Sequence, residues 1–179
     1  MQATSSALAL ARGISRSKIF LFAFFSVITI APLMMIHSQW ITGPLVNATL
    51  ILTCALVGPT EAVILGLFPS PAALTSGLLP LALAAMIPFI MIGNALYVAT
   101  FHYFRKRQTT GIIVGSVLKF AFLSASVNVV MSRLLPSPII KNLSMMMSWP
   151  QLATALIGGA VALALLSFLP RSVRSHQEP

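Results

Sequence analysis

The stretch that decides the fold runs from residue 81 to residue 104 and reads LALAAMIPFIMIGNALYVATFHYF. It holds no Asp, Glu, Lys or Arg, and the cationic triplet Arg105-Lys106-Arg107 follows it directly. An apolar run of this length matches the ~20 residues that a helix needs to cross the hydrocarbon of a bilayer. The stretch therefore predicts a membrane-spanning helix that ends at a cationic boundary.

The composition of the whole chain supports a membrane protein. Of its 179 residues, 58% are hydrophobic and only 7% are charged, whereas about a quarter of the residues in a soluble domain are charged. We therefore expect an all-α integral membrane bundle with one compact domain. The net charge of +9 does not indicate nucleic-acid binding, because the cations cluster beside apolar segments, where membrane topology explains them.

The charge pattern predicts both the number of helices and their orientation. Six apolar segments can be read, at residues 19–36, 42–58, 61–79, 81–104, 111–135 and 150–169. If all six cross the membrane from a cytoplasmic N-terminus, eight basic residues lie on the cytoplasmic face, namely Arg12, Arg16, Lys18, Arg105, Lys106, Arg107, Arg171 and Arg174. Because cytoplasmic loops are enriched in Lys and Arg, we expect six helices with both termini inside.

Three parts of the chain follow from this topology. Residues 1–18 form a basic cytoplasmic segment, residues 19–169 form the six-helix transmembrane domain, and residues 170–179 form a cytoplasmic tail. We expect a multi-pass protein of the cell inner (cytoplasmic) membrane, surrounded by the lipid bilayer. Trp40 and Trp149 then fall at the outer interface, where aromatic side chains are enriched.

Two prolines interrupt the third segment. Pro69 and Pro71 lie in the middle of an apolar run, and proline removes a backbone donor and disrupts the helix around it. At membrane depth, irregular backbone is tolerated only against protein or a water-filled cavity. We predict a broken third helix, which is either an ordinary kink or a short helix followed by a loop over a pocket.

Lys119 is the most unusual single residue, because it is the ninth residue of the fifth segment and so lies near mid-bilayer. A central lysine costs ~2.5–3.5 kcal/mol on insertion scales, so it must face the bundle interior and find partners. With no acid at its depth, its partners are carbonyl groups, Asn side chains, water or an anion, or the amine loses its proton. The residue is either a ligand-binding group or a structural one.

Other polar side chains lie at a comparable depth. Asn94 belongs to the fourth segment, Asn47 to the second, and Ser124 and Asn128 to the fifth. Buried amides often only tie helices together, but here they outline a polar interior in the outer half of the bundle. The candidate substrate-binding residues are Lys119, Asn94, Asn47, Asn128, Ser124, Trp40 and Trp149.

Enzymatic and cofactor chemistry is disfavoured. Glu61 and Glu178 are the only carboxylate side chains, so no paired-carboxylate site can form within one chain. The three histidines, His37, His102 and His176, fall at different levels of the predicted topology, so no two can share a metal ion. We expect no enzyme activity and no cofactor. Glu61 opens the third segment, where it complements the helix dipole or contacts a partner.

Three short stretches resemble a known family. They are residues 42–47 (TGPLVN), 57–66 (VGPTEAVILG) and 86–94 (MIPFIMIGN), and the pair Lys119-Phe120 fits the same group. They look like the substrate-binding (S) components of energy-coupling-factor (ECF) transporters. The resemblance implies a six-helix bundle that binds a small micronutrient, a vitamin or precursor, in its outer half. It also implies three partners, a membrane coupling subunit and two ATPase subunits.

The same resemblance implies a docking face on the first helix. That face often carries an Ala-xxx-Ala motif in the family, whereas here Ala23 and Ala31 stand eight residues apart with Val27 between them. Ala23, Ala31 and Glu61 are therefore the candidate partner-docking residues. The alternative to a transport subunit is a non-transporting membrane anchor or assembly subunit of a larger membrane complex.

Overall fold

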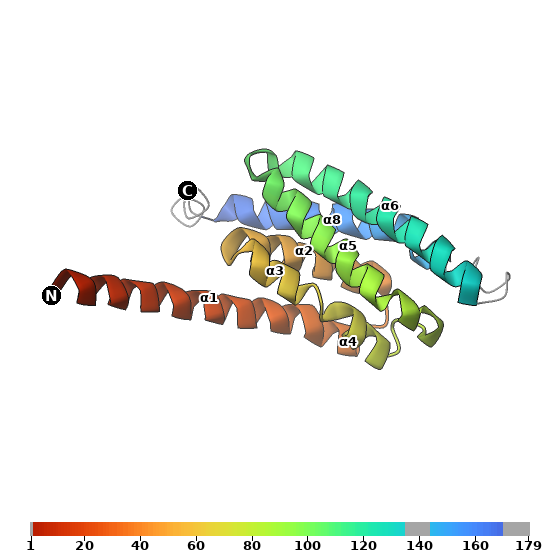
Figure 1. Ribbon diagram of the computed structural model, residues 1–179, viewed down its shortest axis with the longest axis horizontal. Coiled ribbons are helices and arrows are strands. Elements are labelled where there is room, and N and C mark those ends of the chain that lie inside the picture. Colours follow the sequence, from red (N-terminus) through yellow and green to blue (C-terminus); the bar gives the residue numbers. More distant parts are fainter. Residues whose placement is uncertain (1, 135–143, 170–179) are drawn as a thin grey trace.

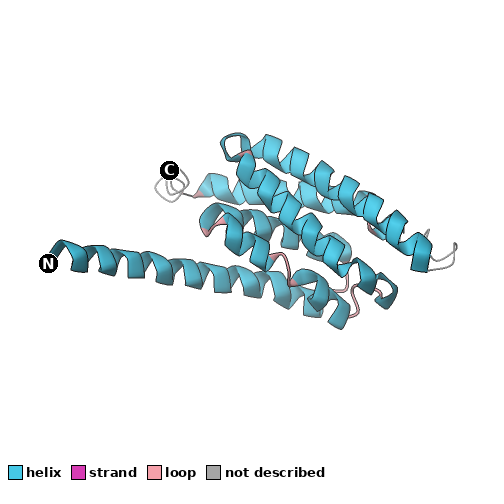
Figure 2. Ribbon diagram, viewed as in Figure 1, coloured by secondary structure: helices cyan, strands magenta, loops and turns pink. Residues whose placement is uncertain are grey.

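The computed structural model describes residues 2–134 and 144–169, and this part of the chain is all helix, turn and short connection, with no strand (Figure 2). The predicted all-α class is therefore confirmed. The long helices are α1 (Gln2–Met35), α2 (Gln39–Leu56), α5 (Ile87–Tyr103), α6 (Gln108–Leu134) and α8 (Trp149–Phe168). The short elements are α3 (Pro59–Leu65), α4 (Pro69–Thr75) and the 3₁₀ turns η1 (Leu81–Met86) and η2 (Arg105–Arg107).

Within the described residues, five helical stretches are long and apolar enough to span a membrane. They are Arg16–Met35, Gln39–Leu56, Leu81–Tyr103, Arg105–Val129 and Ser144–Phe168. This arrangement is consistent with a multi-pass membrane protein. The third predicted segment instead holds α3 and α4, each seven residues long, and neither is long enough to span a membrane alone.

Proline and glycine set the ends of the short helices. Pro59 and Pro69 stand in the first turns of α3 and α4, where a missing backbone N–H costs nothing. After α4, Gly77 has a φ of 78°, a conformation that residues other than glycine rarely adopt.

Helix α1 begins at Gln2, so the segment predicted over residues 19–36 is the second half of one longer helix.

Helix α2 lies at the centre of the bundle and α1 at its edge. In the most apolar 18-residue stretch of α2, 56% of the residues are buried. In the corresponding stretch of α1, 17% are buried. Figure 1 shows α5 and α6 as neighbouring antiparallel helices joined at η2, with α8 and α2 beside them and α1 along the opposite side. A site formed by α2 is therefore enclosed by other helices on most sides.

Glycines allow α8 to approach its neighbours closely. A Cβ atom added to Gly158 would clash with the backbone carbonyl of Pro44 and lie 2.7 Å from the Cβ of Asn47, both in α2. The phenol of Tyr97 in α5 donates a 2.8 Å hydrogen bond to the carbonyl of Ala155 in α8. Small residues and interhelical hydrogen bonds of this kind drive helix association in membranes.

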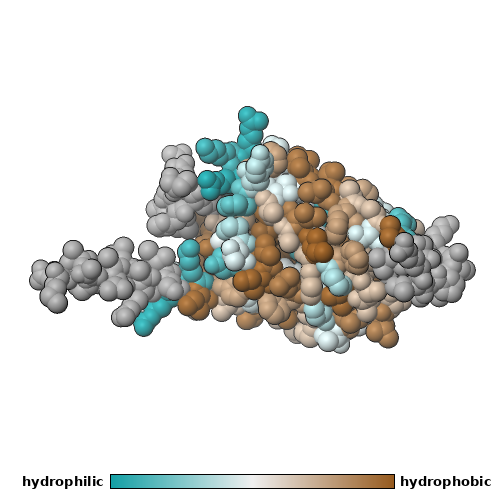
Figure 3. Space-filling model, in the orientation of Figure 1, coloured by the Kyte–Doolittle hydropathy of each residue, from teal (hydrophilic) through white to brown (hydrophobic). Residues whose placement is uncertain are grey.

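The outer surface of the bundle is largely apolar. Large apolar side chains are widely exposed on it. Examples are Phe20 at 73%, Ile113 at 50% and Leu165 at 49% exposed. Figure 3 shows hydrophobic residues over most of the visible face, with hydrophilic residues gathered toward one end. Lys18 and Arg105 share a cavity at one end of the bundle, so two of the predicted cytoplasmic cations lie on the same side of it.

Candidate functional site

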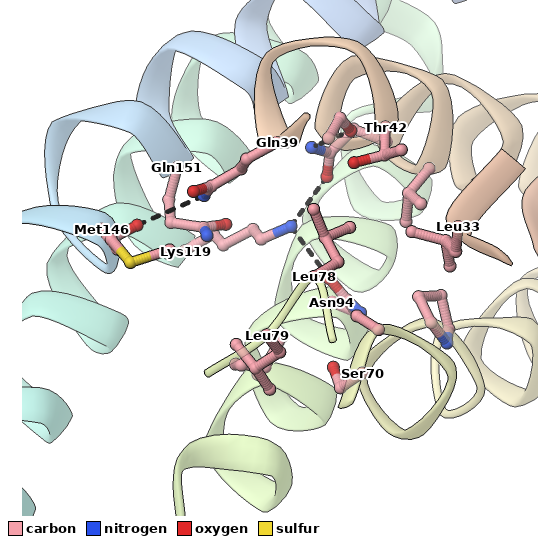
Figure 4. Close-up of a pocket in the computed structure, with 16 residues that line it drawn as sticks. Leu33, Gln39, Thr42, Ser70, Leu78, Leu79, Asn94, Lys119, Met146 and Gln151 are labelled. Carbon is pink, nitrogen blue, oxygen red and sulfur yellow. Dashed lines mark hydrogen bonds between the residues drawn. The ribbon is translucent and has the colours of Figure 1, made fainter. Parts of the chain in front are cut away.

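Lys119 joins three helices from a buried position. Its side chain is only 2% exposed, and Nζ donates hydrogen bonds to Asn47 Oδ1 at 2.7 Å and to Asn94 Oδ1 at 2.8 Å (Figure 4). The lysine comes from α6, Asn47 from α2 and Asn94 from α5. Hydrogen bonds that involve a charged group are about twice as strong as neutral ones, so the two amides offset part of the cost of burial.

Both amides are themselves fixed by backbone carbonyls. Asn47 Nδ2 donates to the carbonyl of Gly43 at 2.9 Å, and Asn94 Nδ2 donates to the carbonyl of Gly66 at 2.9 Å. Because each NH₂ group is occupied in this way, each Oδ1 atom points to the lysine. Gly66 lies between α3 and α4, so Asn94 connects the lysine to the interruption of the third segment.

An aromatic ring completes the surroundings of the ammonium group. The Nζ atom lies 5.6 Å from the ring centroid of Tyr97, within the distance at which a cation is attracted to an aromatic face. Tyr97 is fully buried, and its hydroxyl hydrogen bond to Ala155 fixes the orientation of the ring. The partners of the lysine among the described residues are therefore all neutral.

The charge of Lys119 has no carboxylate partner in the described part of the chain. Glu61 is the one acidic residue there, and it lies in the first turn of α3. An ammonium group has three N–H donors, and two of them have acceptors among the described residues. The third donor is therefore available to an oxygen atom of a bound molecule or of water.

A cavity of about 100 Å³ lies against these polar groups. Its polar lining combines Lys119, Asn47 and Asn94 with Gln39, Thr42, Ser70 and Gln151. Its apolar lining includes Leu33, Val46, Leu78, Leu79, Ile90 and Met146, several of which are labelled in Figure 4. Pockets for drug-sized ligands are typically ~300–1,000 Å³, so this cavity holds a small polar group and a larger ligand requires its walls to move.

The structure brings three of the predicted site residues together and leaves the others apart. Lys119, Asn94 and Asn47 meet at the cavity. Asn128 is exposed, and its amide donates to the carbonyl of Ser124 one turn earlier in α6. Ser124 does not line the cavity, and its hydroxyl oxygen is buried without a partner in the described part of the chain.

The two predicted interface tryptophans contact each other. Their ring centroids lie 5.1 Å apart, and Trp40 and Trp149 are 49% and 54% exposed. They stand near the starts of α2 and α8, one residue and two residues from the cavity-lining Gln39 and Gln151. The tryptophans therefore lie beside the cavity without lining it.

Sequence reasoning missed the two glutamines. Gln39 and Gln151 both line the cavity, and the Gln39 side-chain amide donates to the carbonyl of Met146 at 3.3 Å. Each follows a break between apolar segments, in the first turn of a helix. Their positions beside Trp40 and Trp149 were the available signal. A polar side chain near an interface tryptophan lies at the start of an apolar helix, which is where a pocket opens to the interface.

The predicted docking residues lie on outer surfaces. Ala23 and Ala31 are exposed on α1, as is Val27 between them. Glu61 is half-buried in the first turn of α3 and makes no ion pair with another described residue. Among the described residues, no three His, Cys, Asp or Glu side chains gather where they could hold a metal ion.

Comparison of the chain with protein-family models, curated proteins and solved structures finds no match.

Proposed function

We propose that this chain is the membrane-embedded substrate-binding subunit of an ECF-type importer. In this proposal it captures a small micronutrient, a vitamin or precursor, in the cavity beside Lys119. One observation carries the proposal. A lysine that is 2% exposed, with no carboxylate partner in the described part of the chain, lines a cavity between two fixed amides. Ionisable residues inside a membrane are expensive and usually functional.

The chemistry of the cavity defines the ligand. The free N–H of Lys119 suits a carboxylate or carbonyl oxygen, and such an oxygen offsets the buried positive charge. Gln39 and Gln151 offer both donors and acceptors at the helix starts, while Leu78 and Ile90 supply apolar contact. A compact molecule with one acidic or carbonyl group and an apolar body matches this lining, and its body enters only if the walls of the cavity move apart.

The proposal includes a specific topology in the cell inner membrane. The short helices α3 and α4 together make one crossing, which gives six with both termini in the cytoplasm. The break between them is supported by protein, because the carbonyl of Gly66 accepts a hydrogen bond from Asn94. With the N-terminus inside, the cavity lies in the outer half of the bundle, where an imported solute arrives.

A membrane coupling subunit and two ATPase subunits are the proposed partners. The exposed stripe of Ala23, Val27 and Ala31 on α1 allows close approach by a helix of the coupling subunit. Glu61, unpaired among the described residues, supplies a carboxylate at the start of α3 for the same complex. Energy from ATP would come from the partners, and no catalytic or cofactor role is proposed for this chain.

Native mass spectrometry of gently purified protein tests the binding role. We expect wild-type protein to retain a small molecule, and Lys119→Met to weaken its binding by about 1.5–3 kcal/mol, the range for hydrogen bonds to charged groups. Lys106→Met is the matched control, since it removes the same charge from an exposed position outside the cavity. No retained molecule in any sample, with no binding in a screen of vitamins, would contradict the proposal.

The alternative is a non-transporting anchor or assembly subunit, and one observation favours it. Lys119 already joins α2, α5 and α6 by hydrogen bonds, which is what a purely structural lysine would do. In that case Lys119→Met would lower expression and thermal stability together, without a change in binding per folded molecule. Co-purification of a redox or other membrane complex in place of an ATPase pair would identify this alternative.

A further inference from the structure

A second cavity, of about 480 Å³, opens at the other end of the bundle. It lies where the middle of α1 meets the C-terminal ends of α2 and α5 and the start of α6. The Lys119 cavity, by contrast, adjoins the starts of α2 and α8. The two cavities share no lining residue, so the second one is a separate feature.

The lining of the second cavity has an apolar part and a cationic part. Its apolar part includes Leu21, Leu56 and Phe101, which come from α1, α2 and α5. Its cations are Lys18 and Arg105, and both of these side chains are exposed. The remaining polar lining comes from Ser17, His102 and Gln108.

The two cations have no anionic partner in the described part of the chain. Neither makes an ion pair there, and Glu61, the one described acid, does not line the cavity. Lys106 and Arg107 lie next to Arg105, are exposed, and stay outside the cavity. The concave site therefore has a net positive charge from two different helices, with further positive charge beside it.

We propose that this cavity binds the phosphate headgroup of an anionic phospholipid. Lys18 and Arg105 would contact the phosphate oxygens, and Leu21 and Phe101 would contact the glycerol and the first acyl carbons. Basic pockets between transmembrane helices at the cytoplasmic end bind anionic headgroups in this way. The apolar wall favours a lipid over a soluble anion, because a free phosphate gains nothing from hydrocarbon contact. The proposal depends on membrane insertion and not on the transport role.

Lipid retention measures this binding directly. Delipidated protein is mixed with equimolar phosphatidylglycerol and phosphatidylcholine of identical acyl chains, and bound lipid is counted by native mass spectrometry. We expect wild-type protein to prefer phosphatidylglycerol. The double variant Lys18→Gln/Arg105→Gln should lose that preference by roughly 30-fold, about fivefold for each cation. Because both side chains are exposed, the variant should fold, which circular dichroism and gel filtration verify.

The matched control is Lys106→Gln/Arg107→Gln, which removes the same charge at the same end of the bundle. It should keep at least most of the wild-type preference. Equal losses in the two double variants would overturn the site, since they would show only a general attraction to negative lipids. Displacement of phosphatidylglycerol by millimolar inorganic phosphate or glycerol phosphate would also overturn it, because the site would then belong to a soluble anion.

Discussion

Asn47 and Asn94 accept the same kind of hydrogen bond from Lys119, but their other bonds differ. The Asn47 amide donates to the carbonyl of Gly43, which as a helical carbonyl also accepts the backbone N–H four residues on. The Asn94 amide donates to the carbonyl of Gly66, where α3 has already ended. Loss of Asn94 therefore deprives an interrupted backbone of a partner, whereas loss of Asn47 does not.

This difference predicts unequal effects of two matched substitutions. We expect Asn94→Ala to lower the free energy of unfolding by about 1–3 kcal/mol more than Asn47→Ala, the usual cost of an unsatisfied buried polar group. Both variants remove the same atoms and one acceptor of Lys119. Thermal or denaturant unfolding in detergent compares them, and equal destabilisation would show that the Gly66 carbonyl finds another partner.

At the scale of residues, the sequence predicted how far along its helix each polar side chain lies better than it predicted which side of the helix faces the interior. Counting along the apolar segments gave Lys119, Asn47 and Asn94 as polar residues of the interior, and these three meet. The same counting also gave Asn128, nine residues after Lys119, although nine residues at 3.6 per turn place it on the opposite side of α6. The spacing therefore shows that Lys119 and Asn128 cannot both face inward, but which of the two does so depends on the packing of the neighbouring helices, which the sequence does not give.

Among the elements, α8 and α2 pack closely enough at Gly158 that an added Cβ would meet backbone atoms of α2. The site of Gly158 lies against the Pro44 carbonyl and against Asn47, which in turn accepts the Lys119 hydrogen bond. A side chain at position 158 would therefore push apart the two helices that hold one side of the Lys119 site.

We expect Gly158→Ala to destabilise the protein by about 1–3 kcal/mol, the usual cost of overpacking. Ligand affinity should fall with it, because Asn47 has to move. Ala160→Val, at an exposed position of the same helix, is the control and should be nearly neutral. Thermal unfolding with a binding assay on the folded fraction checks both. Wild-type stability in Gly158→Ala would mean that α8 does not pack this closely.

The α3–α4 interruption makes a second prediction at the scale of elements. Pro69 and Ser70 are buried and line the Lys119 cavity. Pro69→Ala/Pro71→Ala restores two backbone donors and allows the helix to continue. We expect normal insertion but weaker ligand binding, as the wall of the cavity is displaced. Unchanged binding by the folded variant would reduce the interruption to an ordinary kink.

Helix ends were predictable only where a strong signal marks them. The prolines and the cationic triplet mark the starts of α3, α4 and α6 within a few residues. The first segment was predicted from residue 19, after the basic residues, whereas α1 continues back to Gln2. Residues 135–143, which begin at the end of the predicted fifth segment, lie outside the described part of the chain.

For the whole molecule, membrane orientation remains a prediction that labelling can check. Ser38 precedes α2 and Gln108 begins α6, and the two lie toward opposite ends of the bundle. Single cysteines at these positions, in a Cys54→Ser background, should react with a membrane-impermeant reagent from opposite sides. We expect position 38 to react from outside. Reaction of both from one side would rule out six crossings with both termini in the cytoplasm.

The central position of α2 has a consequence for how the protein is synthesised. Its most apolar window has a mean hydropathy of 1.2, against 2.0 for α1, because it carries polar residues such as Asn47 and Thr49. Thr49 is bonded to Thr29 of α1 and within α2 itself, but the neighbours of Asn47 include Lys119 of α6 and Gly158 of α8, which leave the ribosome much later. Until α6 and α8 are made, α2, the least apolar of the five described spans, is in the bilayer without the contacts that Asn47 makes to them. Completion of the Asn47 surroundings thus depends on α8, the latest of the described helices to be made.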